Sequence, residues 1–261
     1  MSSFSALAEE LDTCWCQAGL GNMIFAAELD STNLLARRLL EDCWHQEGGN
    51  CPEVTVLALE QTAGRGRQGR SWVSGRGLGV YVTMVHAVAE SDLQTLPLLA
   101  GVGIARTLRT EFGCKAELKW PNDVQVRGRK IGGVLIETVS RGSGPVAALI
   151  GFGLNHGHPS SQLPTPVSTS LGLEVDPLPQ LSRVASALVA GVTTELAHAG
   201  DESYANDAYQ QLTAHRPGDA LRCRVAGEDI SGIFLGFDQR GFLRLDIEGT
   251  ERLLASGEVI E

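Results

Sequence analysis

The sequence predicts an α+β protein in which a larger domain, residues 1–215, is followed by a small β-barrel, residues 216–261. Over roughly the first 200 residues, stretches with helical spacing of apolar residues alternate with short apolar runs that are typical of strands. The final part of about 45 residues contains closely spaced short strands and turns. A Pro-Gly pair at 217–218 marks the boundary between the two parts.

The composition describes a folded, acidic chain. It has 261 residues, of which 43% are apolar and 20% charged, with a formal net charge of −10 and a pI near 5.1. This charge disfavours general binding to nucleic acid or to an anionic membrane. No apolar run reaches the ~18 residues of a membrane span, and the first residues lack a secretion signal. We therefore expect a cytoplasmic protein without DNA or membrane partners.

Hydrophobic spacing gives the elements of the first half in order. Residues 1–20 predict a short amphipathic helix, because Phe4, Leu7, Leu11 and Trp15 recur at helical intervals. Next we expect a strand over 23–29, a helix from 34, strands over 54–60 and 78–86, and a long helix over 93–112. The loop 61–74 joins two of these strands, so its ligand is expected at the sheet edge.

The second half predicts more strands than helices. Residues 116–123 lead a strand into a proline turn, and residues 124–138 form a hairpin with its turn at Arg127-Gly128. A strand over 145–150 ends in a glycine-rich run that reaches Asn155. The Pro-rich segment 156–170 is expected to be a loop that orders over a ligand. A helix over 178–198 then precedes strands over 220–226, 230–237, 242–247 and 252–261.

The loop at 61–74 is the leading candidate for a binding element. Glycines alternate in it with Arg65, Arg67 and Arg70, so the backbone can approach a ligand closely between guanidinium groups. No Asp or Glu occurs from Gln61 to Ala89, which gives the region a positive local field. The pattern indicates an anion site, although a solvated basic hairpin loop would carry the same residues.

Two further groups of polar residues follow predicted strands. Residues 30–33, Asp-Ser-Thr-Asn, precede a helix, where they can cap the helix or surround a ligand head group. The polar residues next to the hairpin at 124–138 can be explained in two ways. They can form a binding site, or they can simply be a strand end with a solvated lysine and an Asx turn. The glycine pair at 132–133 favours the binding role, because glycine inside a strand indicates a bulge or a ligand lying on the backbone. The residues expected to cluster at this hairpin are Lys119, Asn122, Asp123 and Lys130.

Three other kinds of site are disfavoured by residue spacing. Cysteines at 14, 16, 43 and 51 with His45 fit no common zinc pattern, and scattered cysteines are typical of reduced cytosolic thiols. Gly101 and Gly103 lie within a helical run and so do not form a dinucleotide fingerprint. The run from Gly64 to Ser71 lacks the Gly-Lys-Ser/Thr ending of a P-loop.

Five motifs in order resemble those of biotin protein ligases. They are Asp-Ser-Thr-Asn at 30–33, Gln-x-x-Gly-Arg-Gly-Arg-x-Gly-Arg-x-Trp at 61–72, Lys-Trp-Pro-Asn-Asp at 119–123, Arg-Lys-x-x-Gly at 129–133 and Gly-x-Asn at 153–155. The resemblance extends from about residue 23 to the end of the chain. It implies a catalytic domain with the mixed sheet of class II aminoacyl-tRNA synthetases, followed by a barrel of the SH3-like type.

The resemblance also implies a reaction and its partners. Biotin would react with ATP to give biotinyl-5′-AMP and pyrophosphate, and the biotinyl group would pass to one lysine of the biotin carboxyl carrier protein of acetyl-CoA carboxylase. Mg²⁺ would be held mainly by the ATP phosphates, so no metal ligand is assigned in the chain. A winged helix-turn-helix segment is not expected, so a repressor role is not implied. Some members pair through sheet edges, which makes a homodimer plausible.

Positions that match the family's motifs are expected to carry its roles. The residues expected to act in catalysis are Arg65, Arg67, Lys130 and Asp123. The residues expected to bind biotin are Ser31, Thr32, Asn33, Gln61, Arg65, Gly66, Arg67, Lys130 and Gly133. The residues expected at ATP and the adenylate are Arg67, Arg70, Trp72, Lys119, Asn122 and Asn155. The alternatives are a lipoate or octanoyl ligase or transferase of the same fold, or a non-enzymatic biotin-sensing regulator.

Overall fold

The computed structural model describes residues 4–45, 51–141 and 146–260. The helices of these residues are α1 (Phe4–Gln17), α2 (Thr32–His45), α3 (Leu96–Phe112), α4 (Leu171–Glu174), α5 (Leu181–Leu196) and α6 (Glu202–Leu212), with short 3₁₀ turns at Arg67–Gly69, Glu90–Asp92 and Ser160–Gln162. The strands are β1 (Asn22–Ala26), β2 (Val54–Ala58), β3 (Gly79–Val88), β4 (Ala116–Lys119), β5 (Asp123–Val126), β6 (Arg129–Ser140), β7 (Val146–Asn155), β8 (Ala220–Val225), β9 (Glu228–Phe237), β10 (Leu243–Ile247), β11 (Thr250–Leu254) and β12 (Glu258–Val259).

The larger sheet is mixed and has the order β1-β2-β3-β7-β6-β5-β4. The β1–β2 pair is parallel and the other neighbouring pairs are antiparallel. The hairpin between β5 and β6 turns at Arg127 and Gly128, both with positive φ, as the sequence predicts. A register shift between Val124 and Gln125 lies opposite the glycine pair of β6, so this hairpin contains the expected irregularity.

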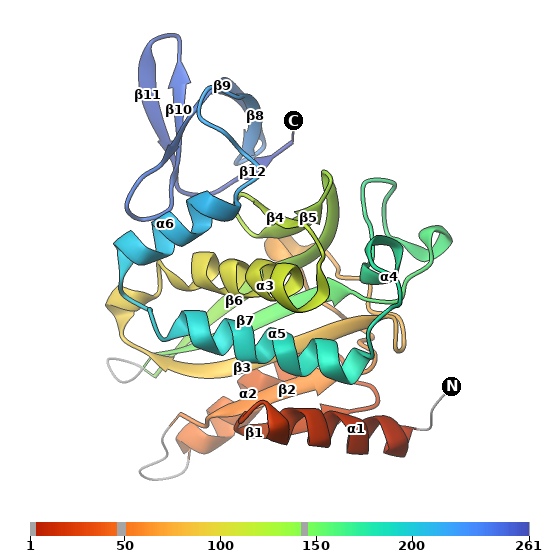
Figure 1. The fold of residues 1–261 in the computed structure, drawn as a ribbon. Helices are drawn as coiled ribbons and strands as arrows, with labels where there is room; N and C mark the ends of the chain where they lie inside the picture. The colour runs from red at the N-terminus through yellow and green to blue at the C-terminus, as the bar shows by residue number, and fades with distance from the viewer. Residues whose placement is uncertain (1–3, 46–50, 142–145, 261) are drawn as a thin grey trace.

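Helices cover the two faces of this sheet unequally (Figure 1). Helix α2 packs on one face, where Leu40 and Trp44 meet Val56, Val85 and Leu149 in a small apolar cluster. Neighbouring strand residues such as Met84 and Ile150 point to the other face, because side chains alternate along a strand. There they join a larger core formed with α1, α3, α5 and α6. The face that carries α2 is thus only partly covered by helix.

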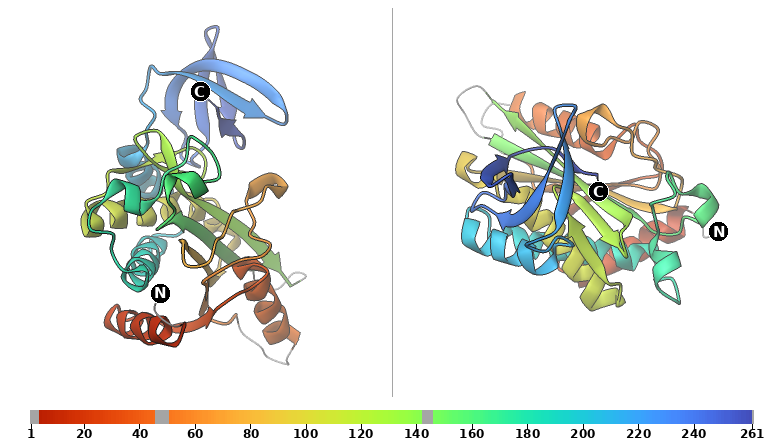
Figure 2. Two further views of the ribbon diagram at one scale, coloured as in Figure 1. Left: turned by 90° about the vertical axis from the view of Figure 1, so that its right-hand side faces the viewer. Right: turned by 90° about the horizontal axis from the view of Figure 1, so that it is seen from above.

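The C-terminal strands form a second sheet at one end of the molecule, beyond α6 and β4, while α1 lies toward the other end (Figures 1 and 2). This sheet is antiparallel and has the order β11-β10-β9-β8-β12. Among the described residues its outer strands do not pair with each other, so the sheet is open. The predicted final strand at 252–261 is wrong in detail, because β11 and β12 are separate strands with Gly257 between them at φ 145°.

Several other expectations are also corrected. Helix α6 was not predicted from the sequence, although Ala205, Ala208 and Leu212 give it an apolar face. Strand β7 does not end near Ile150 but continues to Asn155, and β1 is shorter than predicted. The loop 61–74 was expected at the sheet edge, but it joins β2 and β3, which are interior strands. No helix of the described residues combines the length and apolar character that crossing a membrane requires.

Candidate active site

One cleft collects nearly all the candidate residues. It encloses about 880 Å³, including the open solvent at its mouth. Its walls are the loop 61–74, the start of α2, the β4–β5–β6 region and the glycines of β7. The predicted residues that line it are Ser31, Thr32, Asn33, Gln61, Arg65, Gly66, Arg67, Arg70, Trp72, Lys119, Asn122, Asp123, Lys130 and Gly133.

Asn155 is the predicted site residue that does not line this cleft. Its side chain is buried, and its Nδ2 donates to the Thr169 carbonyl oxygen at 2.9 Å. Thr169 belongs to the Pro-rich segment 156–170. Ser168 of the same segment forms a parallel β-bridge with Lys130. In this structure, therefore, Asn155 contacts the segment beside Lys130 instead of the cleft.

The floor of the cleft is the sheet face on the α2 side. Strand register aligns Thr83, Gly151 and Leu135 in one row and Gly153 with Gly133 in the next. Paired residues point to the same face, so the glycines and Leu135 of these rows line the cleft, whereas Thr83 is fully buried against Thr32 and Asn33. A Cβ at Gly153 would come within 2.6 Å of the Trp72 indole, and one at Gly151 would overlap the Asn33 amide. Glycine is required at both positions so that side chains above can approach the backbone.

A hydrogen-bonded network lies at one end, which we call the neutral end (Thr32, Asn33, Gln61, Ser74 and Thr83). The first three residues line the cleft, and Ser74 and Thr83 lie behind them and bond to Gln61 and Thr32. The Thr32 N–H donates to Gln61 Oε1 at 2.8 Å, and Gln61 Nε2 donates to Ser74 Oγ at 2.8 Å. Thr83 Oγ lies 2.8 Å from Thr32 Oγ and 2.5 Å from Asn33 Oδ1. Since Thr32, Asn33 and Thr83 are buried, this network fixes their polar atoms before any ligand arrives.

Glu137 extends this network toward the Arg-rich loop. Asn33 Nδ2 donates to Glu137 Oε2 at 2.8 Å, and Arg65 Nη1 lies 3.2 Å from Glu137 Oε1. The sequence analysis missed Glu137, Thr83 and Ser74. Thr83 lies within an apolar strand where threonine is an ordinary strand former, so it carries no sequence signal of its own. Only the register with Gly151 reveals its position.

Positive charge gathers at the other end, which we call the cationic end (Arg67, Lys119, Asn122, Asp123 and Lys130). Lys130 Nζ lies 2.6 Å from Asp123 Oδ1 and 5.5 Å from the centre of the Trp72 ring. Arg67 Nη1 donates to Asn122 Oδ1 at 3.0 Å, and Asn122 Nδ2 donates to the Val134 carbonyl oxygen. Burial, and to a smaller extent the nearby Arg70, lowers the pKa of Arg67, whereas Asp123 and Glu258 act in the opposite direction.

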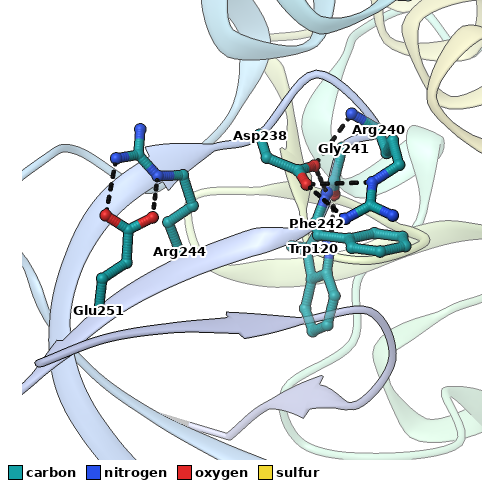
Figure 3. A network of polar contacts seen from close by, with 7 residues as sticks. All are labelled: Trp120, Asp238, Arg240, Gly241, Phe242, Arg244 and Glu251. Atoms are coloured by element: carbon teal, nitrogen blue, oxygen red, sulfur yellow. Dashed lines mark hydrogen bonds and ion pairs between the residues drawn. The ribbon is translucent and has the colours of Figure 1, made fainter.

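The C-terminal sheet completes the rim of the cleft. Gly257 and Glu258 line it, and Arg70 Nη1 of the loop lies 3.1 Å from Glu258 Oε1. Nearby, Trp120 Nε1 donates to the Gly241 carbonyl oxygen at 3.1 Å (Figure 3). These contacts hold the second sheet against the strand end that carries Lys119.

A second cleft adjoins the first beneath the β9–β10 turn. It shares Arg67, Trp120, Pro121 and Asn122 with the first cleft. Figure 3 shows how Asp238 orients Arg240 through bonds of 3.3 Å, while the guanidinium carbon of Arg240 lies 4.4 Å from the Phe242 ring centre. The two clefts therefore meet at the cationic end.

Three comparisons relate the chain to known proteins. Residues 30–155 match the model of the biotin/lipoate A/B protein ligase family. The chain is 32% identical over 245 residues to the biotin–[acetyl-CoA-carboxylase] ligase of Paracoccus denitrificans, covering 89% of this chain and 98% of the relative. It is 29% identical over 255 residues to the enzyme of that name from Mycobacterium tuberculosis, covering 93% and 90% respectively.

A solved structure shares the fold. The biotin protein ligase from Aquifex aeolicus in complex with biotin and ATP superposes with a TM-score of 0.73 and 24% identity. The match covers 92% of this chain and 98% of that one. At this identity the likeness supports the architecture, with the mixed sheet and its helices.

Proposed function

Since this chain belongs to the biotin protein ligase family, we propose that it activates biotin with ATP and transfers the biotinyl group to a lysine of a carrier protein. The observation that carries the proposal is the polarity of the cleft. A buried neutral end and a cationic end lie on one glycine floor, and Trp72 stands over that floor. Such a cleft suits a molecule with a flat polar ring at one end and a carboxylate at the other.

The neutral end is proposed to read the ureido ring of biotin. A ureido group has N–H donors and a carbonyl acceptor. The buried Ser31, Thr32 and Asn33, with the half-buried Gln61, would offer both kinds of partner. A buried polar site rejects molecules that lack the matching groups, because its own groups are then left unpaired. The acyl chain would run over Gly133 toward Lys130.

The first chemical step brings two anions together. A carboxylate oxygen of biotin attacks the α-phosphorus of ATP, a C–O–P anhydride forms, and pyrophosphate leaves with the electron pair of the broken P–O bond. We assign Lys130 and Arg67 to screen the two anions and to stabilise charge on the phosphate, with Arg65, Arg70 and Gly66 closing the loop over the adenylate. Lys119, Asn122 and Trp72 would lie beside the nucleotide. No residue has to act as a covalent nucleophile.

The second step needs an amine in its neutral form. The acceptor lysine attacks the acyl carbon and gives up one N–H proton, an amide forms, and AMP leaves with the electron pair of the broken C–O bond. Asp123, whose Oδ1 lies 2.6 Å from Lys130 Nζ, would orient the incoming amine and accept its proton. The biotin carboxyl carrier protein of acetyl-CoA carboxylase is the acceptor we propose, in keeping with the activity for which the relatives are named.

Mg²⁺ would enter as the MgATP substrate. The described residues contain no group of three or more metal-binding side chains of the His, Cys, Asp or Glu type. Among the described residues, Asp123 and Glu258 are the carboxylates that line the cleft, so phosphate oxygens would supply most of the ligands of the ion. The metal would neutralise the leaving pyrophosphate, while Lys130 and Arg67 act on the carboxylate and the α-phosphate.

The remaining proposals concern organisation. Residues 1–215 would form the catalytic domain and residues 216–261 the SH3-like domain, with Arg70–Glu258 among the contacts between them. A homodimer would form through a sheet edge, where β1 and β4 are the outer strands. A cytoplasmic location suits free cysteines and a substrate such as ATP.

The test is detection of the adenylate. Purified protein is mixed with MgATP and biotin, and in parallel with lipoate or octanoate, and the products are identified by mass spectrometry. We expect biotinyl-AMP and pyrophosphate from biotin alone, because an octanoyl chain offers nothing to the buried polar atoms of the neutral end. Product only from lipoate or octanoate would overturn the assignment of the substrate, and no product from any acid would overturn the enzymatic role.

A further inference from the structure

Glu174 is a buried carboxylate outside the cleft. It ends the short helix α4, and its side chain is only 1% exposed. Burying a charge is unfavourable unless partners compensate it. Its Oε1 lies 2.6 Å from Arg129 Nη2 and accepts a hydrogen bond of 2.6 Å from Thr169 Oγ. Its Oε2 lies 3.8 Å from Arg127 Nη1 and has no hydrogen-bond partner among the described residues.

Both close partners of Glu174 flank Lys130. Arg129 precedes Lys130 in β6, and strand alternation sends the Arg129 side chain away from the face that carries Lys130. The Thr169 N–H donates to the Lys130 carbonyl oxygen at 2.8 Å, and the Lys130 N–H donates to the Val167 carbonyl oxygen at 2.8 Å. The Glu174 carboxylate thus bonds both to β6, through Arg129, and to the segment 156–170, through Thr169. These two stretches pair with each other at Lys130.

Thr169 also connects Glu174 to Asn155, a second residue expected at the site. Its carbonyl oxygen accepts the bond from Asn155 Nδ2, and its own side chain is fully buried. A shift of the Thr169 peptide would therefore move the partners of both Lys130 and Asn155. Buried ion pairs contribute little net stability compared with apolar packing, so stability alone does not account for a carboxylate at this place.

We propose that Glu174 is a positioning residue for adenylate formation, which holds the backbone of Lys130 through Arg129 and Thr169. This inference rests on the proposed role of Lys130. Glu174 itself touches no substrate: it keeps Lys130 Nζ between Asp123 and Trp72, where biotin and ATP are to meet.

The test compares two buried carboxylates that each pair with an arginine. Glu174→Gln keeps the side-chain shape and removes the charge. The matched control is Glu195→Gln, because Glu195 is 8% exposed on its side chain and lies 2.7 Å from Arg106, between α5 and α3 and away from the cleft. Each variant is measured for biotinyl-AMP formation and for amide hydrogen exchange.

In the kinetic measurement, we expect Glu174→Gln to lower kcat for adenylate formation about 100-fold with little change in the KM for biotin, because misplacing a reacting group affects the transition state most. Glu174→Asp should recover part of the rate, and Glu195→Gln should keep the wild-type kcat. Equal kcat in wild type and Glu174→Gln, or an equal loss in Glu195→Gln, would overturn the proposal.

The exchange measurement is independent of the reaction. In Glu174→Gln the amides of Lys130 and Thr169 should exchange at least about tenfold faster, and in Glu195→Gln they should not change. Unchanged exchange in Glu174→Gln would also overturn the proposal. If the wild-type protein made no adenylate, the proposed function would fail, whereas the exchange comparison would still decide whether Glu174 orders Lys130.

Discussion

The two ends of the cleft are built differently. At the neutral end, Thr32, Asn33 and Thr83 are buried and bonded to one another or to Gln61, so their geometry is set by the fold. At the cationic end and along the loop 61–74, the ion pairs lie near the surface: the side chains of Lys130 and Arg70 are 36% and 54% exposed. The neutral end is therefore preorganised, whereas a ligand can replace the exposed ion pairs of the cationic end. If the proposed roles hold, the acid meets a fixed site and the phosphate meets one that rearranges.

The largest effect is expected from removal of the charge at the cationic end. Lys130→Ala should reduce adenylate formation by about 10²–10³-fold, because a cation aimed at developing negative charge is lost. Its unfolding free energy should change by less than about 1 kcal/mol, since the ion pair with Asp123 is partly exposed. The measurement is single-turnover formation of biotinyl-AMP beside thermal unfolding. Lys115→Ala, an exposed lysine outside the cleft, is the control, and undiminished turnover in Lys130→Ala would remove Lys130 from the site.

The second effect concerns pH and His215, which lies beside Lys119. Burial, and then the Lys119 charge, lowers the pKa of His215 to about 4. The unfolded chain binds a proton near pH 6.5, so stability is complete above that pH and falls as pH drops toward about 4, by at most about 3 kcal/mol.

Urea unfolding of wild type and His215→Phe between pH 7.5 and 4.5 checks this expectation. The phenyl ring preserves packing on Phe234 and cannot titrate, so the variant should lose less stability on acidification. Other buried histidines, such as His156, also have lowered pKa values and reduce the stability of both proteins at low pH. The measured quantity is therefore the difference between wild type and variant in the slope of unfolding free energy against pH. Parallel slopes would show that His215 is protonated in the folded protein as it is in the unfolded chain.

The third prediction concerns biotin binding at the neutral end, which should change without an effect on ATP. Thr83→Val removes the hydroxyl between Thr32 and Asn33 and leaves both without that partner, which should weaken biotin binding by about 2 kcal/mol, or roughly 30-fold. The KM for ATP should change little. Titration calorimetry with biotin measures the loss. Thr193→Val, whose hydroxyl is bonded only within α5, should bind biotin normally, and equal affinity in both variants would exclude Thr83 from recognition.

The smallest effect is expected at the rim. Arg70 and Glu258 form an exposed pair between the loop and the C-terminal sheet, so a double-mutant cycle with alanine should give at most about 1 kcal/mol of coupling, decreasing with salt. Chemical unfolding of the four proteins at two ionic strengths measures it. Coupling well above this, unaffected by salt, would show that the loop is fixed as firmly as the neutral end.

The sequence predicted the fold where periodicity was clear. The strands of the main sheet, the helices α1, α3 and α5 and the Arg127-Gly128 turn follow from apolar spacing and turn residues. Helix α6 was missed because its polar majority, from Glu202 to Gln211, hides a narrow apolar stripe. The split between β11 and β12 depends on Gly257, whose positive φ has no distinct signal in sequence.

The sequence predicted most of the residues that line the cleft but not the contacts between them. Motifs located Thr32, Gln61 and Lys130, because polar residues and glycines at the ends of strands stand out from apolar runs. Thr83 and Glu137 could not be found in this way, since their proximity to Asn33 depends on strand register and on contacts far apart in the chain. Tertiary pairing, which local spacing does not encode, brings them into the site.

Limited trypsin digestion tests the central contrast most directly, because Arg65, Arg67 and Arg70 place cleavage sites in the loop itself. Fragments are identified by mass spectrometry for the free protein, for the protein with biotin, and for the protein with a non-hydrolysable biotinyl-AMP analogue. We expect cleavage after these arginines in the free protein and at least about tenfold slower cleavage with the analogue, while cleavage at Arg141, away from the cleft, stays constant. Equally fast cleavage of the loop with and without the analogue would contradict the proposal that this loop closes on the adenylate.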